Sequence, residues 1–212
     1  MKNYFLVPLL LGYALALPLA AAAEDSDKAR SAVSVFRTTG GSIQTDLGSG
    51  IVIGKGSSLT REFLAVRHVN FPIILKGAPG VRTIYEPQTS ISLAGLKYKA
   101  KVLVSAYEPA AAIEVRFITF DIWGEKQRVL VMTIVRDLPV GDSELSAAWD
   151  LFSEHEARTY YASIAYIAKV RLSDGRVLST DIEPVLNQAR KFSARFTSAD
   201  LEKDEPRIRL DR

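Results

Sequence analysis

Residues 160–172 constrain the fold of this chain more than any other segment. Every second residue is apolar, and Lys169 and Arg171 occupy alternate positions. Successive side chains of a β-strand point to opposite faces, so this pattern predicts a long strand with one buried face. The apolar row consists of Tyr160, Ala162, Ile164, Tyr166, Ala168, Val170 and Leu172.

A hairpin turn is predicted directly after this strand. Asp174-Gly175 separates it from residues 176–178, and Asp-Gly favours a two-residue turn whose central residues both have positive φ. We therefore expect Gly175 at positive φ and residues 176–178 as the returning strand.

Three earlier segments are also predicted to be strands. Residues 97–104 alternate, with Lys97, Lys99 and Lys101 on a solvated face that discourages edge-to-edge association. Residues 113–122 carry apolar residues on both faces, so the second half of this strand is expected to be buried on both sides. Residues 128–135 are rich in β-branched side chains, which favour strands.

One helix is predicted near the C-terminus. Residues 180–183 match a capping box, in which Thr180 caps the helix and Glu183 reaches back. The expected buried stripe consists of Ile182, Val185, Leu186 and Ala189. Arg190 and Lys191 suit the last turn, where cations complement the helix dipole.

These elements predict an all-β fold with a minor helix. The expected architecture is an antiparallel, immunoglobulin-like β-sandwich over residues 61–180, followed by a C-terminal helix and charged tail over residues 181–212. Residues 24–60 form a Gly- and Ser-rich N-terminal segment. Two apolar pieces in it, residues 32–36 and 51–53, are either edge strands or parts of a partly ordered arm.

Residues 1–23 are predicted to be a cleavable signal peptide. Lys2 precedes a charge-free apolar run at residues 5–20, and the alanines at 21–23 provide a small-x-small cleavage site. A retained anchor is the alternative, but the run contains Pro8 and Pro18 and is shorter than the ~20 residues of a spanning helix. We expect a periplasmic or secreted protein with no membrane span in the mature chain.

The composition excludes several kinds of chemistry. The chain contains no cysteine, which rules out thiol nucleophiles, cysteine-based zinc sites and a lipid anchor on cysteine. Residues 61–105 carry seven basic and two acidic residues, whereas residues 106–160 carry five basic and ten acidic ones. We expect these two segments to face each other, and we predict no nucleic-acid partner because no uncompensated basic face is evident.

No catalytic, cofactor-binding or metal-binding residue is assigned from the sequence. Gly-Ser-Gly at residues 48–50 followed by His68 resembles the start of trypsin-like serine proteases, with Ser143 as the imagined nucleophile. That chemistry needs a histidine within hydrogen-bond reach of the serine and a carboxylate to orient it. Glu-Leu at residues 144–145 replaces the expected Gly-Gly, so we favour a surface role for His68.

Other partial motifs also fail. Residues 49–56 lack the first glycine and the final hydroxyl of a phosphate-binding loop. His155 lacks the second histidine of the zinc-protease motif, which favours a surface histidine. The spacing of the remaining acidic candidates defines no acid–base pair. These candidates are Asp121, Asp137, Asp142, Glu154 and Glu156.

Aromatic residues are the last candidates for a site. Trp123, Trp149, Tyr160 and Tyr161 form either a ligand platform or part of the core, and the core is the preferred interpretation.

Part of the chain resembles a known class of domains. Residues 117–124 form an aromatic–Asp strand end with a glycine turn, residues 138–141 a Leu-Pro-Gly-like segment, and residues 166–175 a final hairpin. Together, over about residues 110–180, they are similar to bacterial FxLYD-type and related immunoglobulin-like domains. Val140 interrupts the Pro–Gly pair and no Tyr precedes Asp121. The resemblance implies an extracytoplasmic accessory or binding module without catalytic residues.

The predicted function is that of an exported, non-enzymatic module that contacts another macromolecule, such as an exported protein or a cell-envelope component. The sequence leaves the ligand and the oligomeric state open. The alternative is a serine-protease-like hydrolase. A deep pocket of titratable groups with shifted pKa values favours the enzyme, whereas a shallow exposed apolar patch favours the binding module.

The signal peptide is directly testable. We expect the exported protein to begin at or near Glu24, because the three alanines at residues 21–23 fit the cleavage pattern. Mass spectrometry of the exported pool measures this terminus, and an intact Met1 there would contradict cleavage.

Overall fold

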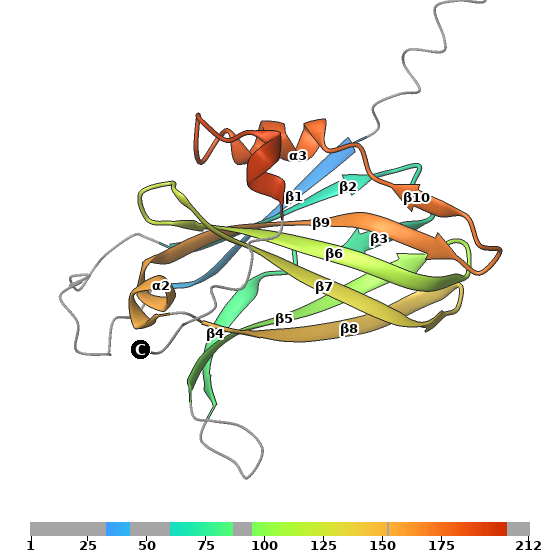
Figure 1. Cartoon of the computed structure of the whole chain (residues 1–212), viewed down its shortest axis with the longest axis horizontal. Helices are drawn as coiled ribbons and strands as arrows, with labels where there is room; N and C mark the ends of the chain where they lie inside the picture. Colours follow the sequence, from blue (N-terminus) through green and yellow to red (C-terminus); the bar gives the residue numbers. More distant parts are fainter. Residues whose placement is uncertain (1–32, 43–59, 87–94, 152, 203–212) are drawn as a thin grey trace, which may run out of the picture. The chain divides into compact units, whose positions relative to one another are not determined.

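Strand β9 (Tyr160–Leu172) is the middle strand of the larger of two β-sheets in the computed structural model (Figure 1). The structure describes residues 33–42, 60–86, 95–151 and 153–202. The larger sheet has the order β1-β2-β9-β6-β7, with β10 paired to the end of β9. Its other strands are β1 (Val33–Ser42), β2 (Thr60–His68), β6 (Ala110–Asp121), β7 (Lys126–Leu138) and β10 (Val177–Ser179).

The smaller sheet is built around β5 (Gly95–Ala106). Strand β8 (Gly141–Asp150) pairs along one side of β5, while β3 (Ile73–Lys76) and β4 (Val81–Glu86) pair with successive parts of its other side. Three short helical elements complete the described chain: α2 (Glu154–Thr159), α3 (Glu183–Ala189) and the 3₁₀ helix η1 (Ser198–Leu201). The predicted all-β class with a minor helical part is therefore confirmed.

One strand pair departs from the expected antiparallel arrangement. β2 and β9 run parallel, with Leu64 opposite Ile164. Parallel strands need a long crossover, and here the intervening chain, which forms β3 to β8, provides it. β1 pairs antiparallel with β2, so the apolar piece at residues 32–36 contributes to an edge strand. The second piece, residues 51–53, and the predicted signal peptide lie outside the described residues.

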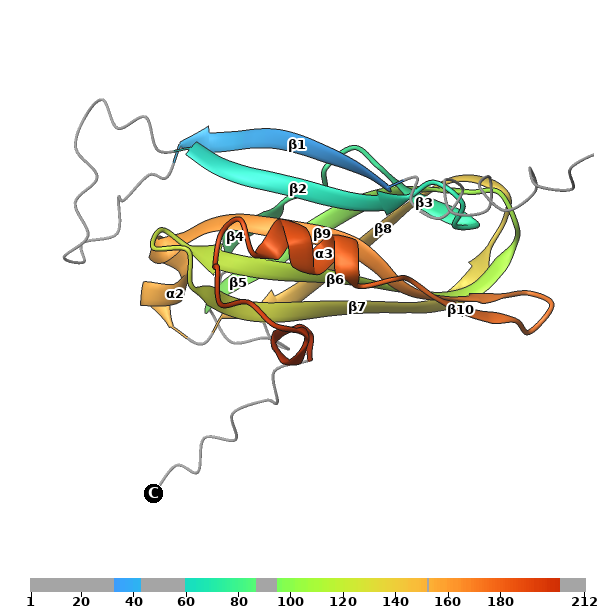
Figure 2. The same cartoon turned by 90° about the horizontal axis from the view of Figure 1, so that it is seen from above.

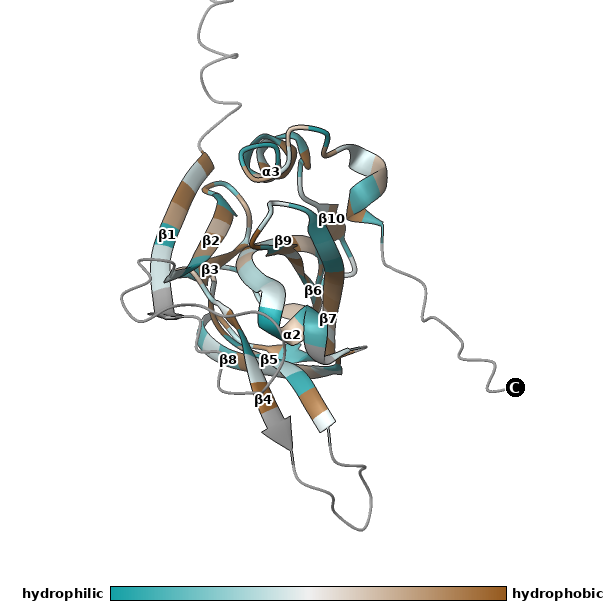
Figure 3. Cartoon of the chain, turned by 90° about the vertical axis from the view of Figure 1, so that its left-hand side faces the viewer, coloured by the Kyte–Doolittle hydropathy of each residue, from teal (hydrophilic) through white to brown (hydrophobic). Residues whose placement is uncertain are grey.

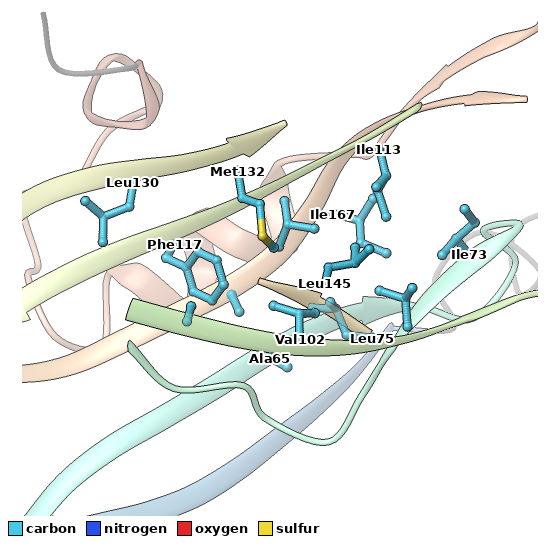
Figure 4. Close-up of a cluster of buried hydrophobic side chains, with 14 of the residues drawn as sticks. Ala65, Ile73, Leu75, Val102, Ile113, Phe117, Leu130, Met132, Leu145 and Ile167 are labelled. Carbon is cyan, nitrogen blue, oxygen red and sulfur yellow. The ribbon is translucent and has the colours of Figure 1, made fainter. Parts of the chain in front are cut away.

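The first core lies between the two sheets. In Figure 4, Val102 and Leu145 from the smaller sheet face Phe117, Met132 and Ile167 from the larger one. All five side chains are buried. Burial of one such side chain contributes about 1.5–3 kcal/mol, so this interface is the main source of stability between the sheets.

The second core lies on the opposite face of the larger sheet. Helix α3 and the chain after it cover this face (Figure 2), and the hydropathy view shows α3 on the side away from β5 and β8 (Figure 3). Phe120 of β6 stacks on Phe192 with 5.0 Å between ring centroids, and Phe196 lies 5.8 Å away. The start of the charged tail is also packed, because Leu201 is buried and its carbonyl accepts a hydrogen bond from Arg116.

The apolar row of β9 serves two cores rather than the one that its periodicity predicts. Tyr160 and the last two members of the row belong to the core between the sheets, whereas Ala162 to Ala168 belong to the outer core. The register against β6 skips Tyr161 and Ala168, which marks two β-bulges. Each bulge adds an unpaired residue and so turns the following side chains to the other face.

The hairpin after β9 forms at the predicted place with a different loop. Gly175 has φ +92°, as expected. Asp174, which a two-residue turn would also place at positive φ, does not have it, since no described non-glycine residue has positive φ. The amide of Gly175 bonds the Leu172 carbonyl, and the Leu172 amide bonds the Arg176 carbonyl. The loop therefore contains three residues, 173–175, and Gly175 supplies the left-handed position that ends such loops.

The predicted capping box of α3 is wrong. The helix begins at Glu183 with Ile182 as its N-cap, and the carboxylate that accepts a hydrogen bond from the Glu183 amide is that of Asp181 rather than the hydroxyl of Thr180. The amide of Thr180 instead bonds the Ala168 carbonyl, which extends the contact with β9 and keeps Thr180 outside the helix. Val185, Leu186 and Ala189 are buried as predicted, whereas Ile182 is exposed. No helix among the described residues is long and apolar enough to cross a membrane.

Side chains close one seam between the sheets, where β7 and β8 lie edge to edge without a ladder. Trp149 donates its indole hydrogen to the Val131 carbonyl, Arg136 donates to the Glu144 carbonyl, and Arg128 donates to the Asp150 carbonyl. These bonds satisfy main-chain acceptors that a free strand edge leaves open.

Two glycines provide a matched test of how the C-terminal segment packs. Gly124 and Gly175 both have positive φ, but only at Gly124 would an added Cβ collide with described atoms, namely the Phe192 carbonyl. We expect Gly175→Ala to cost about 1 kcal/mol of unfolding free energy from backbone strain alone. Gly124→Ala should cost at least about 1 kcal/mol more, because the Phe192 segment must shift. Chemical denaturation measures both, and equal losses would contradict the close packing of Phe192 on the β6–β7 turn.

Candidate functional site

Four short connections meet at one end of the two sheets, at the right of Figure 1. They are residues 69–72, 107–109, 139–140 and 173–176, and we call them the loop end. The Tyr107 amide bonds the Pro72 carbonyl and the Ser173 amide bonds the Pro109 carbonyl. Gly141 pairs with Ala106, which brings the β7–β8 connection to the same place.

The loop end displays large apolar side chains. Tyr107 and Val140 are 60% and 63% exposed, and Val69 and the adjoining Val177 are more than half exposed. Single exposed apolar residues are normal, but several on connections at one end of the sheets are the arrangement expected of an interaction patch.

Ion pairs fix the loops that carry this patch. Arg176 contacts both Glu108 and Asp174 at 2.6 Å, and so links the β5–β6 and β9–β10 connections. Hydrogen bonds from the Arg176 amide and guanidinium hold the pKa of Asp174 below its ordinary value. A surface that is ordered before binding loses less conformational entropy when a partner docks.

The outer face of the smaller sheet carries the uneven charges seen in the sequence. Lys101 of β5 contacts Glu144 of β8 at 3.0 Å, and Lys76 of β3 contacts Asp142 of β8 at 2.7 Å. Lys97 approaches Asp150 at 3.9 Å. The predicted pairing of the basic and acidic segments is thus confirmed on this face. Exposed pairs of this kind each contribute little stability, typically ~0–1 kcal/mol.

A groove of about 610 Å³ lies beside β4 at the other seam of the sheets. Its apolar lining includes Phe63, Pro79 and Ile84, and Arg82 and Lys99 add positive charge. Thr38 and Thr39 of β1 line it as well. Its volume falls within the range of about 300–1,000 Å³ typical of ligand sites.

Polar side chains gather under α2, where they anchor the helix. Gln127 donates to the Thr159 hydroxyl and the Glu156 carbonyl, and accepts a bond from the Tyr98 hydroxyl. The Tyr98 and Tyr160 rings pack edge to face at 5.4 Å. Burial raises the pKa of both phenols, so they stay neutral at physiological pH. Gln127, Tyr98 and Thr159 bond to one another and to the main chain, as expected of a structural cluster.

His68 ends β2 and is half-buried rather than on the open surface. Burial lowers its pKa, and the charge and backbone of Asp181 partly oppose this shift. It lines a small cavity together with Thr180 and Phe71.

Ser143 and His155 lie on other elements. Ser143 pairs with Val104 on β5 in the smaller sheet, whereas His68 belongs to the larger one. His155 is exposed in α2, and its carbonyl accepts a bond from Thr159. Within the described ranges, no three His, Asp or Glu side chains are grouped to hold a metal ion.

The acidic candidates have local partners where the structure describes them. Asp121 accepts bonds from the amides of Trp123 and Glu125, and so fixes the β6–β7 turn. Lys76 lowers the pKa of Asp142, and Glu156 lies 3.8 Å from Arg128. Asp137 is exposed, and the side chain of Glu154 lies outside the described residues.

The four aromatic candidates separate into core and surface residues. Tyr160 is fully buried, Trp149 packs on Phe117 at 5.8 Å, and Tyr161 bonds Glu62. Trp123 is 79% exposed in the β6–β7 turn, at the opposite end of β6 from the loop end. Tyr107 was not predictable as a site residue from the sequence, because it lies alone in a short connection with no motif around it.

Comparison with known proteins adds little. No family model matches the chain, and no curated protein matches it. A solved structure of a hypothetical protein from Peptoclostridium difficile 630 aligns with a TM-score of 0.42 at 9% identity. The alignment covers 59% of this chain and 93% of the other. A similarity this weak supports no conclusion, and the resemblance to immunoglobulin-like domains stays a prediction.

The environment of His68 predicts a pH-dependent stability. Because its pKa is lowered in the folded state, the unfolded chain binds its proton more readily. The contribution of His68 to the free energy of unfolding is therefore fully present above the pKa of an unfolded histidine, about 6.5, and declines as the pH falls below that value. We expect His68→Gln to show a flatter loss of stability than the wild type between about pH 7 and pH 5. Denaturation curves across this range measure the difference, and parallel pH profiles would contradict a lowered pKa.

Proposed function

We propose that this chain is an exported, non-catalytic module that contacts another macromolecule through the loop end. One observation carries the proposal: exposed apolar side chains, including Tyr107 and Val140, stand on neighbouring connections at one end of the sheets, and the ion pairs of Arg176 hold the connection that carries Tyr107. An aromatic or aliphatic anchor on a rigid loop is a common basis for protein recognition.

The proposed location follows from the N-terminal sequence. The apolar run at residues 5–20 and the alanines at residues 21–23 support export to the periplasm or the medium. The partner is then another exported protein or a component of the cell envelope. The similarity of about residues 110–180 to immunoglobulin-like modules supports the same proposal.

The placement of the protease-like residues favours binding over hydrolysis. Asp181 is the carboxylate near His68, and a histidine base would further need the serine within hydrogen-bond reach. Ser143 instead lies in the other sheet, on β8. This arrangement supports the non-catalytic module over the hydrolase.

Site-specific photocrosslinking tests the contact surface. A benzoylphenylalanine at position 107 should form adducts in intact cells, because a partner would cover this side chain. The same group at position 123 is the matched control, since Trp123 is also an exposed aromatic but lies at the opposite end of β6. Adducts from position 107 that disappear with Val140→Ser would support the proposal. Adducts from position 123 alone would place the contact elsewhere and contradict it.

A further inference from the structure

The groove beside β4 lies between two strands that each have one partner among the described residues. β4 pairs with β5, and β1 pairs with β2. Thr38 and Thr39 of β1 line the groove on one side, and Arg82 and Ile84 of β4 line it on the other. The seam at β7 and β8 is closed by bonds from side chains to carbonyls, whereas this seam contains open volume of about 610 Å³.

Two cations in the groove face each other across the β4–β5 ladder. Arg82 is the register partner of Lys99, and both side chains are exposed. The β8 residue opposite Lys99 is Ala148, so the acidic row of β8 supplies no carboxylate at this position. Like charges directly opposite in a sheet are destabilising. Among the residues that the structure describes, neither cation has an ion-pair partner.

The rest of the groove suits an extended chain with alternating side chains. Phe63, Ala78 and Pro79 give apolar contacts, while Arg82 and Lys99 offer bonds to anions. A free strand edge provides main-chain donors and acceptors at the spacing of a further strand. Peptides that add to a sheet edge use these bonds for affinity and side-chain contacts for specificity.

We propose that this groove binds an extended, carboxylate-bearing peptide segment of a partner protein, which pairs along β4 and places its acidic side chains against Arg82 and Lys99. The site is separate from the loop end. Lys99 and Tyr107 are eight positions apart on one strand and its connection, a distance of roughly 26 Å in extended chain. The failure of either proposal therefore leaves the other untouched.

A defined peptide tests the site. The probe is a fluorescein-labelled hexapeptide of alternating Glu and Val with both ends blocked, and binding is followed by fluorescence anisotropy. We expect Arg82→Gln with Lys99→Gln to weaken binding about tenfold, since two exposed charge contacts are lost. Lys169→Gln with Arg171→Gln is the control, because it removes two exposed cations from one face of β9. This control should bind like the wild type.

Stability measurements test whether weaker binding of the double variant arises from a destabilised fold rather than from the loss of a ligand contact. Neutralising Arg82 and Lys99 removes the repulsion between them, so the thermal midpoint of the double variant should stay unchanged or rise. Weaker binding together with an unchanged or higher midpoint supports a ligand site. A lower midpoint would mean that the two cations stabilise the free fold, which contradicts the proposal.

Two further probes separate a peptide from other anions. A version of the hexapeptide with N-methylated alternate amides cannot form the strand ladder, and it should bind at least about tenfold more weakly. Equal binding of the methylated peptide would overturn strand addition. Tighter binding of an oligogalacturonate than of the peptide would identify an acidic polysaccharide as the ligand and overturn the peptide assignment.

Discussion

Burial of β9 on both faces is the constraint on which the rest of the structure depends. The strand lies between β2 and β6, so neither of its edges is free, and apolar side chains leave it in both directions. One sheet alone would expose half of them. The smaller sheet covers one face and α3 with its following segment covers the other. The two bulges at Tyr161 and Ala168 determine which side chains of β9 face the smaller sheet and which face α3 and the segment after it.

This arrangement also explains why a short helix matters in an all-β protein. α3 has only seven residues and a single buried stripe, so its intrinsic stability in water is low. Its buried side chains pack on the face that Ile164 and Tyr166 present. The packing of Phe120 against Phe192 and Phe196 then fixes the chain beyond the helix. Tertiary contact with the sheet, rather than propensity, therefore holds the C-terminal segment.

The sequence predicted the existence of the main strands better than their local geometry. Alternation identified β5 and β9, apolar residues on both faces identified β6, and β-branched residues identified β7. Asp-Gly identified the turn with Gly175 at positive φ. The bulges were missed because Ala168 and Tyr161 have no sequence signature, and their position depends on the register against β6. The predicted cap at Thr180 is wrong because the Thr180 amide donates a hydrogen bond to the Ala168 carbonyl of β9. The candidate sites were harder still. The Arg82–Lys99 pair appears only once the β4–β5 register is known, and Tyr107 gains its meaning from neighbours that are distant in sequence.

The two candidate surfaces leave groups in an unfavourable state of a kind that other parts of the fold resolve. On the outer face of the smaller sheet, Lys97, Lys101 and Lys76 have carboxylates nearby, and at the seam between β7 and β8 the main-chain carbonyls accept hydrogen bonds from side chains. At the loop end Tyr107 and Val140 remain in water, and in the groove Arg82 and Lys99 remain opposed. Neither feature is needed for the core, since polar residues at these exposed positions would keep the same turns and ladders. Features that cost solubility or stability without supporting the fold are expected where a protein meets its ligands. The energetics of the free chain therefore favour a binding role for both the apolar loop end and the cationic groove.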